Sequence, residues 1–183
     1  MKKTKNFMFN RNPMLILSYL SRNISKDNIT SHISNDLSLG VGSVHGILKE
    51  FERTGLVRSK RVGKSVLYEI NKDEPLVKSF RVFDNLMELR PLIEMLKPNT
   101  RKIILFGSCA KGEDNFESDF DLLIVADESE KDSVMDSISE YEIDREIKPI
   151  ILDIFEFMEM ESNEPVFYKE VMKGIELWEV SDE

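Results

Sequence analysis

Three apolar segments in the first third of the chain are spaced as on one face of a helix. Turn-forming residues at 23–26 end the first segment, and Gly55 follows the third segment as a C-terminal glycine. In the third segment, the positions i, i+3, i+4 and i+7 are Val44, Ile47, Leu48 and Phe51. The pattern predicts helices over residues 12–23, 28–37 and 43–54.

The next segment, GLVRSKRVGKSVLYEI (residues 55–70), alternates apolar and polar positions on both sides of Gly63-Lys64. Alternation with a period of two, interrupted by a glycine-containing pair, is typical of a β-hairpin. Four basic side chains lie near its predicted tip, namely Arg58, Lys60, Arg61 and Lys64.

Residues 75–97 are rich in apolar positions, and Pro91 is expected to divide them into two helical pieces. The segment is too apolar for a flexible linker. It either packs against its own domains or forms a dimer interface, and we expect a homodimer. The predicted organisation is therefore a first domain over 1–74, a helical connector over 75–97 and a second domain over 98–183.

The second domain begins with KIILF (residues 102–106), a β-branched run suited to a buried strand. A second apolar run follows Asp121, and the remaining segments alternate between helical and strand patterns. Helices are expected near 131–141, 153–160 and 165–172, with strands near 145–153 and 175–180. The predicted fold class is α+β in two domains, the second an α/β unit with a small mixed sheet.

Composition limits the cellular setting and the kinds of site. The sequence holds one cysteine, Cys109, which excludes an intrachain disulfide framework and leaves too few thiols for a zinc cluster. His32 and His45 have no second ligand at metal-binding spacing, so we expect no metal site in the first domain. No run of about 18 apolar residues occurs. We expect a soluble, cytoplasmic protein that does not associate with membranes.

The net charge of -9 conceals a strong asymmetry. Residues 1–72 hold 13 basic and 5 acidic side chains, a balance of +8, whereas residues 73–183 hold 12 basic and 29 acidic side chains, a balance of -17. The two domains therefore have different partners, and the basic one is suited to nucleic acid.

The outer face of the third predicted helix is small and rich in hydrogen-bond donors, which suits a helix in the DNA major groove. Three helices followed by a basic hairpin resemble a winged helix-turn-helix DNA-binding domain, and the sequence SVHGILKEFERTGLV carries this resemblance over about residues 10–72. A winged helix used only for protein contacts is the alternative. The resemblance implies contacts with double-stranded DNA through Ser43, His45, Lys49, Arg53, Arg58, Lys60, Arg61 and Lys64.

Gly107 and Ser108 follow the first strand of the second domain, where glycine lets an anion approach backbone N–H groups. Lys111 and Gly112 extend this predicted phosphate cradle. After ten intervening residues, Asp119 and Asp121 stand at i and i+2 on a strand, so their carboxylates share one face. Such a pair can hold Mg²⁺ ions together with the phosphate oxygens of a nucleotide.

The stretch GSCAKGEDNFESDFDLL resembles the signature of the polymerase-β-like nucleotidyltransferase superfamily, in its minimal (MNT-type) form. The resemblance covers about residues 98–180. It implies that Gly107 and Ser108 bind the phosphates of ATP or another nucleoside triphosphate and that Asp119 and Asp121 hold two Mg²⁺ ions. An acidic surface turn between two strands is the alternative interpretation.

A third family carboxylate should lie on a following strand, which we place at residues 145–153. The middle of this strand holds Lys148, Pro149 and Ile150, where an acid would be expected. Glu146 and Asp153 at its ends are candidate catalytic acids. Asp153 also suits a helix N-cap with Glu156 at N3, and the absence of any third acid is the other alternative.

These features lead to two functional hypotheses. The first is a DNA-binding, Mg²⁺-dependent nucleotidyltransferase that moves a nucleoside monophosphate, AMP in the main hypothesis, to a hydroxyl of a protein or other acceptor. Family resemblance suggests an autoregulatory, antitoxin-like role with a HEPN-type toxin as acceptor. The second hypothesis is a transcriptional regulator whose nucleotidyltransferase-like domain binds nucleotide without catalysis. A third reading makes both domains inert interaction modules.

Overall fold

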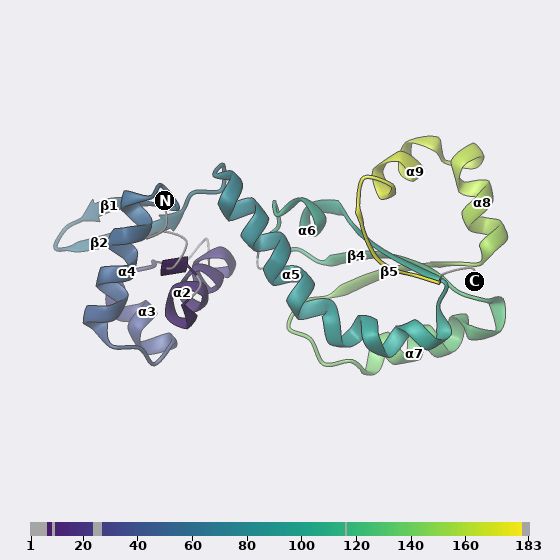
Figure 1. The fold of residues 1–183 in the computed structure, drawn as a ribbon, viewed down its shortest axis with the longest axis horizontal. Helices are drawn as coiled ribbons and strands as arrows, with labels where there is room; N and C mark the ends of the chain where they lie inside the picture. Colours follow the sequence, from purple (N-terminus) through teal and green to yellow (C-terminus); the bar gives the residue numbers. More distant parts are fainter. Residues whose placement is uncertain (1–6, 9, 24–26, 116, 181–183) are drawn as a thin grey trace. The chain divides into compact units, whose positions relative to one another are not determined.

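The computed structural model describes residues 7–8, 10–23, 27–115 and 117–180. Its internal contacts divide the chain into two compact units, Met1–Arg81 and Val82–Glu183 (Figure 1). The division falls inside one helix, so the predicted connector is not a separate body, and the domain bounds expected from the sequence stay a prediction.

In the described part of the first unit, the three helices predicted from the sequence are followed by a two-stranded antiparallel sheet. The elements are α2 (Arg11–Arg22), α3 (Thr30–Asp36), α4 (Val41–Arg53), β1 (Val57–Val62) and β2 (Ser65–Ile70). Residues 24–26, part of the turn expected after the first helix, lie outside the described residues.

The apolar face of α4 forms the centre of this unit. Val44, Leu48 and Phe51 are completely buried there, as their helical spacing predicts. Tyr68 of β2 is also buried, and its N–H donates to the carbonyl of Asn28, 2.9 Å away. The hairpin is thereby fixed to the helices by both packing and backbone hydrogen bonding.

Strands β1 and β2 are joined by a two-residue turn, with Val62 paired to Ser65. Gly63, the first turn residue, has a φ of 59°, in the left-handed region that glycine adopts without steric cost. The turn therefore projects the basic end of the hairpin away from the core.

Helix α5 (Pro75–Leu96) runs through Pro91 without interruption, so the expected division into two pieces is wrong. Proline removes one backbone hydrogen bond, normally to the carbonyl four residues earlier, at Met87. Both residues are exposed, so water can hydrate the freed carbonyl. Leu89 and Leu92 on either side of the proline are fully buried, and their packing keeps the helix continuous.

The second unit is built on a four-stranded mixed sheet with the order β5-β4-β3-β6, in which only β4 and β5 are parallel. The predicted small mixed sheet is confirmed. Its strands are β3 (Lys102–Phe106), β4 (Phe120–Val125), β5 (Ile147–Leu152) and β6 (Ile175–Glu179). Its other elements are η1 (Lys97–Asn99), α6 (Gly107–Lys111), η2 (Glu128–Glu130), α7 (Lys131–Glu140), α8 (Ile154–Asn163) and α9 (Pro165–Val171).

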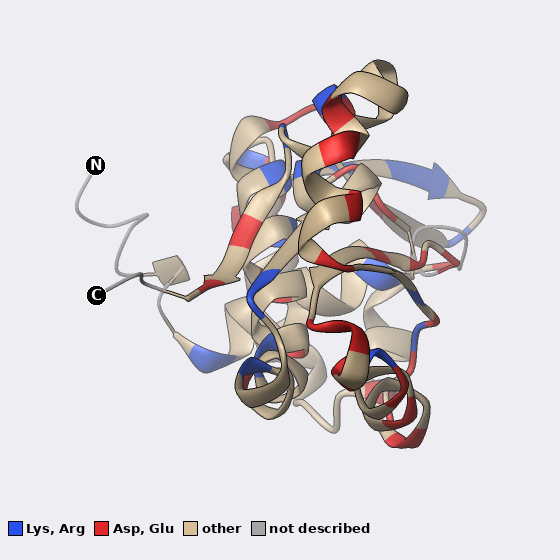
Figure 2. Ribbon diagram, turned by 90° about the vertical axis from the view of Figure 1, so that its right-hand side faces the viewer, with Lys and Arg blue, Asp and Glu red and all other residues tan. Residues whose placement is uncertain are grey.

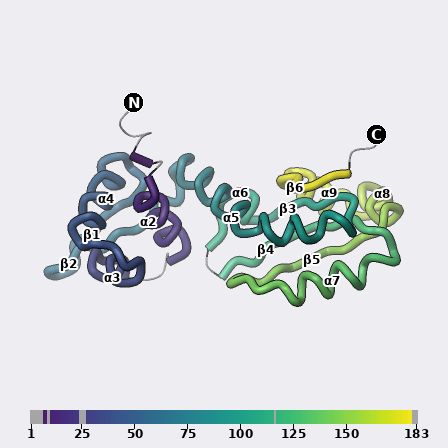
Figure 3. Tube along the Cα trace, turned by 60° about the horizontal axis from the view of Figure 1, so that its bottom comes forward, coloured from purple at the N-terminus to yellow at the C-terminus, as the bar shows by residue number. Residues whose placement is uncertain are grey.

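Helices cover both faces of this sheet. Figure 3 shows α5 and α7 along one face, where they pack on Leu105, Leu122 and neighbouring side chains. The opposite face, which includes Phe106 and Leu123, is covered by α8 and α9 (Figure 1). Because side chains alternate along a strand, the odd-numbered positions of β4 face α8 and α9.

Figure 2 marks the positions of Lys and Arg in blue and of Asp and Glu in red along the ribbon. In the described part of the chain, no helix combines the length and the apolar character needed to cross a bilayer.

Replacing Gly174 with alanine should destabilise the second unit. An added Cβ would lie 2.3 Å from the carbonyl oxygen of Leu105 and 2.8 Å from that of Val171, so backbone must move. We expect a loss of about 2 kcal/mol in the free energy of unfolding. Urea denaturation followed by the fluorescence of Trp178, the sole tryptophan, measures it.

The matched control is Gly42→Ala in α4 of the first unit, where an added Cβ meets nothing within 4 Å. This change should leave the Trp178 transition in place. An unshifted transition in Gly174→Ala would contradict the packing assigned to residue 174.

Candidate functional site

The end of β3 and the beginning of β4 meet at Gly107 and Asp121. Phe106, the last residue of β3, pairs with Asp121 in the antiparallel ladder. Gly107 has a φ of 70°, and an added Cβ would lie 2.2 Å from Oδ2 of Asp121. Only glycine allows the chain to turn this closely past the carboxylate. The backbone that starts α6 is therefore in direct contact with one of the two predicted site acids.

The rest of the predicted phosphate cradle divides into two parts. Ser108 directly follows Gly107 and is half-buried. Lys111, at the end of α6, forms an ion pair with Glu170 of α9, and this hydrogen bond raises the pKa of the lysine. Gly112 caps the helix with a φ of 66° and donates its N–H to the carbonyl of Ser108. Gly107 and Ser108 thus adjoin the acid pair, while Lys111 is directed toward α9.

Asp119 and Asp121 flank Phe120, the first residue of β4, so their side chains share the face covered by α8 and α9. Burial raises the pKa of Asp121, and the neighbouring Asp119 carboxylate raises it further, while Lys148 opposes both effects. Two adjacent carboxylates, one partly desolvated, favour a cation between or beside them.

The nearest cation in the structure is the ammonium of Lys148. Lys148 is the second residue of β5 and pairs in register with Asp121 in the parallel ladder. Its Nζ forms an ion pair with Oδ2 of Asp119. Sequence reasoning noted this lysine as a departure from the expected acid but missed its contact with Asp119. That contact depends on the register of β4 against β5, which the sequence does not specify.

The two candidate third acids lie at opposite ends of β5. Glu146 accepts a hydrogen bond at its backbone carbonyl from the N–H of Phe120, 2.9 Å away, which places it at the same end as the acid pair. Asp153 lies five residues beyond Lys148, at a distance of about 16 Å along the strand.

Asp153 is used instead as the N-cap of α8. Its Oδ1 accepts hydrogen bonds from the backbone N–H groups of Phe155 and Glu156, at 2.7 and 2.8 Å. The Glu156 side chain accepts from the N–H of Asp153 and completes a capping box. The structure thus places the backbone of Glu146, and not Asp153, at the end of the sheet that carries the acid pair.

The donor set suits a divalent ion only in part. Asp119 and Asp121 supply hard oxygen ligands of the kind that Mg²⁺ prefers. Across the described residues, no group of three or more His, Cys, Asp or Glu side chains is arranged to hold a metal. The pair therefore fits one ion that shares ligands with bound phosphate, while the two-ion site expected from the sequence has no third protein carboxylate in place.

A buried arginine holds the surrounding loops together. Arg145, with a side chain only 4% exposed, donates to Asp114 at 3.0 Å and to Glu88 at 2.9 Å. It also donates to Oδ1 of Asn85 at 2.7 Å, and its guanidinium lies 3.8 Å from the centre of the Phe120 ring. The cluster joins α5 to the loop after α6 and to the first residue of β4.

Cys109 lies beside this cluster and is completely buried. Its thiol donates to the carbonyl of Asp119, 3.1 Å away. Burial, with a further contribution from the charge of Asp114, raises the pKa of the thiol to about 12. Cys109 is therefore a protonated packing residue at neutral pH.

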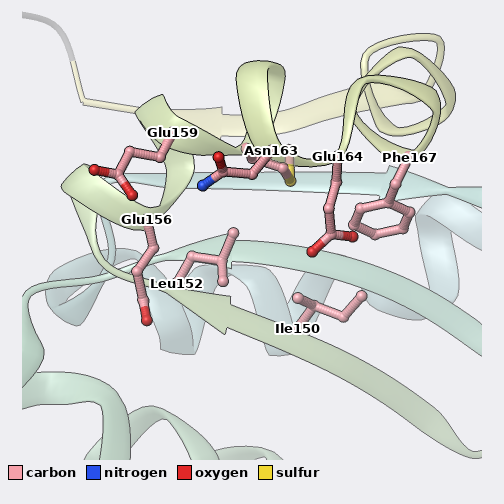
Figure 4. Close-up of a pocket in the computed structure, with 8 residues that line it drawn as sticks. Ile150, Leu152, Glu156, Glu159, Asn163, Glu164 and Phe167 are labelled. Atoms are coloured by element: carbon pink, nitrogen blue, oxygen red, sulfur yellow. The ribbon is translucent and has the colours of Figure 1, made fainter.

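A separate cavity of about 520 Å³ lies farther along β5, between this strand and the helices α8 and α9 (Figure 4). Sequence reasoning gave no sign of it. Its lining residues are Ile150, Leu152, Glu156, Glu159, Met160, Asn163, Glu164 and Phe167. Three carboxylates make this cavity unsuitable for a triphosphate, which is better matched by the backbone N–H groups at Gly107 and Ser108.

The first unit contains the other predicted site. All eight residues proposed for DNA contact are exposed, four on α4 and four on the hairpin; they are Ser43, His45, Lys49, Arg53, Arg58, Lys60, Arg61 and Lys64. Lys49 and Arg53 form i,i+3 ion pairs with glutamates of α4, and Arg58 pairs with Asp73 at 3.3 Å. Lys60, Arg61 and Lys64 extend along the hairpin toward its turn.

Replacing Arg145 with methionine should destabilise the second unit by about 3–5 kcal/mol, because Asp114 and Glu88, which are largely shielded from water, would lose the buried guanidinium that they contact. The Trp178 unfolding transition in urea measures the loss. Arg101→Met is the matched control, since Arg101 pairs with Asp127 at an exposed site and should contribute less than about 1 kcal/mol. Equal effects of the two changes would contradict the anchoring role of Arg145.

Comparison with known proteins identifies the second unit. The family described as "Polymerase beta, Nucleotidyltransferase" matches residues 90–183, just over half of the chain. No curated protein matches the sequence. One similar solved structure is described as the predicted DNA-binding transcriptional regulator from E. coli; it is 22% identical, with 43% of this chain and 80% of that chain covered and a TM-score of 0.38.

Proposed function

The chain belongs to the polymerase β nucleotidyltransferase family, and we propose that its second unit binds a nucleoside triphosphate while its first unit binds double-stranded DNA. The observation that carries the nucleotide proposal is the contact between Gly107 and Asp121. It brings the backbone at the start of α6, whose N–H groups suit phosphate, next to the carboxylate of Asp121, which suits the accompanying cation.

In the proposed complex, the N–H groups at Gly107 and Ser108 bind phosphate oxygens of ATP or another nucleoside triphosphate. Asp119 and Asp121 would hold Mg²⁺, which neutralises phosphate charge and makes the α-phosphorus more electrophilic. Arg145 supports this site without touching the nucleotide. Its guanidinium packs on Phe120, the residue between the two aspartates, and pairs with Asp114 in the loop that follows α6.

We infer that this unit serves primarily as a nucleotide-binding regulatory domain. Lys148 pairs with Asp121 in register and contacts Asp119, at the position where the sequence analysis expected a third acid. A cation there cannot act as a general base or as a ligand for a second metal ion. The function supported best is therefore a DNA-binding regulator that responds to a nucleotide.

Nucleotidyl transfer is the second candidate, and the position of Glu146 favours it. Glu146 lies at the acid-pair end of β5, where its carboxylate could accept the proton of an attacking hydroxyl. The hydroxyl oxygen would bond to the α-phosphorus as the bond to the pyrophosphate breaks, which leaves AMP on the acceptor. An antitoxin-like role with a HEPN-type toxin as acceptor would be one instance.

For the first unit, the proposed DNA contacts are the exposed face of α4 and the basic hairpin. Ser43 and His45 are placed to reach base edges, while Lys60, Arg61 and Lys64 are placed to neutralise phosphates. Recognition by a homodimer on a two-fold site is the arrangement we propose.

Changing Asp119 or Asp121 to asparagine should weaken ATP binding in Mg²⁺ by about tenfold or more, since each change removes an anionic ligand of the ion. Isothermal titration calorimetry measures the affinity. Asp132→Asn, an exposed change on α7 across the sheet, should have no effect. Equal ATP affinity in all three variants and the wild type would remove the acid pair from the nucleotide site.

The wild type, the two aspartate variants and Glu146→Gln together distinguish a nucleotide-binding regulator from a nucleotidyltransferase. With α-labelled ATP, Mg²⁺ and a cell extract, transfer predicts a labelled acceptor that disappears in Glu146→Gln as well as in the aspartate variants. Regulation predicts ATP binding without label. A labelled acceptor that persists without both aspartates would contradict the proposed site.

Replacing Lys60, Arg61 and Lys64 together with alanine should weaken DNA binding and lower its salt dependence. Each phosphate contact contributes about 0.9 to the slope of log affinity against log salt, so the slope should fall by about 2.7. Fluorescence anisotropy at several salt concentrations measures it. A triple change at Lys131, Lys169 and Lys173 of the second unit removes equal charge and should leave the slope unaltered.

A further inference from the structure

We propose that Lys148 is a built-in cation of the acid pair, which competes with a divalent metal ion for Asp119. The inference rests on the proposed nucleotide site and states how that site is regulated. Its basis is the direct ion pair between Nζ of Lys148 and Oδ2 of Asp119, together with the register that sets Lys148 opposite Asp121.

The position of Lys148 is set by the sheet. Residues in register on parallel strands point to the same face, so Lys148 and Asp121 stand side by side on the face covered by α8 and α9. Asp119 lies two residues earlier on the neighbouring chain segment, within reach of the four-carbon lysine stem. The pairing of β4 with β5 is therefore sufficient to bring the lysine side chain to Asp119.

Charge explains why the ammonium remains there. Asp119 contacts the ammonium directly and Asp121 stands opposite Lys148 in register, so both carboxylates attract the charged lysine. Two acids and one base therefore lie together at the site. Removal of Lys148 would leave the acids without this cation and would increase their attraction for a divalent ion.

The ion pair is strong enough to compete but weak enough to yield. The side chain of Lys148 is 56% exposed and that of Asp119 is 26% exposed, so solvent screens the interaction. A metal ion that arrives with a triphosphate brings additional ligands and can displace the ammonium, which is then free to contact phosphate. A metal ion alone lacks that advantage, so the nucleotide-free site should bind it poorly.

The test is a titration of nucleotide-free, full-length protein with Mn²⁺, with free Mn²⁺ followed by electron paramagnetic resonance. Mn²⁺ accepts the same oxygen ligands as Mg²⁺. Lys148→Met should raise Mn²⁺ affinity about fivefold, the upper range for loss of a competing exposed ion pair. Adding Asp119→Asn to that variant should remove the gain, which locates the ion at the acid pair.

Two controls separate charge competition from other effects. Lys148→Arg keeps the charge, and its affinity for Mn²⁺ should stay within about twofold of the wild type. That difference is smaller than the effect expected from losing one exposed ion pair. Lys169→Met, an exposed change on α9, removes the same charge from the same unit and should also match the wild type. Circular dichroism melting confirms that each variant is folded.

Failure of this inference is distinct from failure of the proposed function. Equal Mn²⁺ affinity in Lys148→Met and the wild type, or no measurable binding in either, overturns the competition. A fivefold gain that depends on Asp119 supports it even if the wild type binds no ATP, in which case the nucleotide proposal fails alone.

Discussion

The buried guanidinium of Arg145 is the interaction on which the arrangement of the second unit depends. A charge removed from water must be compensated by partners with correct geometry, and here Asp114 and Glu88 provide them from two different segments. Because these partners lie on the loop after α6 and on α5, neither segment can move far without breaking an ion pair with Arg145. The face of the same guanidinium packs on Phe120, the residue between the two site acids. The buried guanidinium thereby fixes the end of β4 that carries Asp119 and Asp121.

The candidate site itself follows from strand pairing. Phe106 opposite Asp121 brings the turn at Gly107 against the carboxylate, and the absence of a Cβ allows the contact. Parallel pairing of β4 with β5 adds Lys148 to the same edge. The site is therefore assembled from three segments. Gly107 and Asp121 lie 14 residues apart in the sequence, whereas Lys148 lies 27 residues beyond Asp121.

Local patterns in the sequence predict the elements well, and the reason is physical. The helical spacing of Val44 and Phe51 and the alternation around Gly63 indicate which face of each segment is buried, and that information lies within the segment itself. Helix α5 departs from local expectation because packing on both sides outweighs the cost of Pro91. The Arg145 cluster, the cavity beneath α8 and the contact of Lys148 depend on which distant segments meet, and no local pattern contains that information.

The register of β5 decides which chemistry the acid pair can perform. A shift of one residue would turn Lys148 to the opposite face and bring Ile147 or Pro149 to Asp121. In the observed register, Lys148 of β5 shares the acid-pair face at this end, and Glu146 directly precedes the strand. Lys148 stands opposite Asp121 and its ammonium pairs with Asp119, so a cation lies where a second metal ion would need a carboxylate. That arrangement supports the proposed nucleotide binding more than rapid nucleotidyl transfer, because the proposed binding involves only the Gly107 turn and the two aspartates.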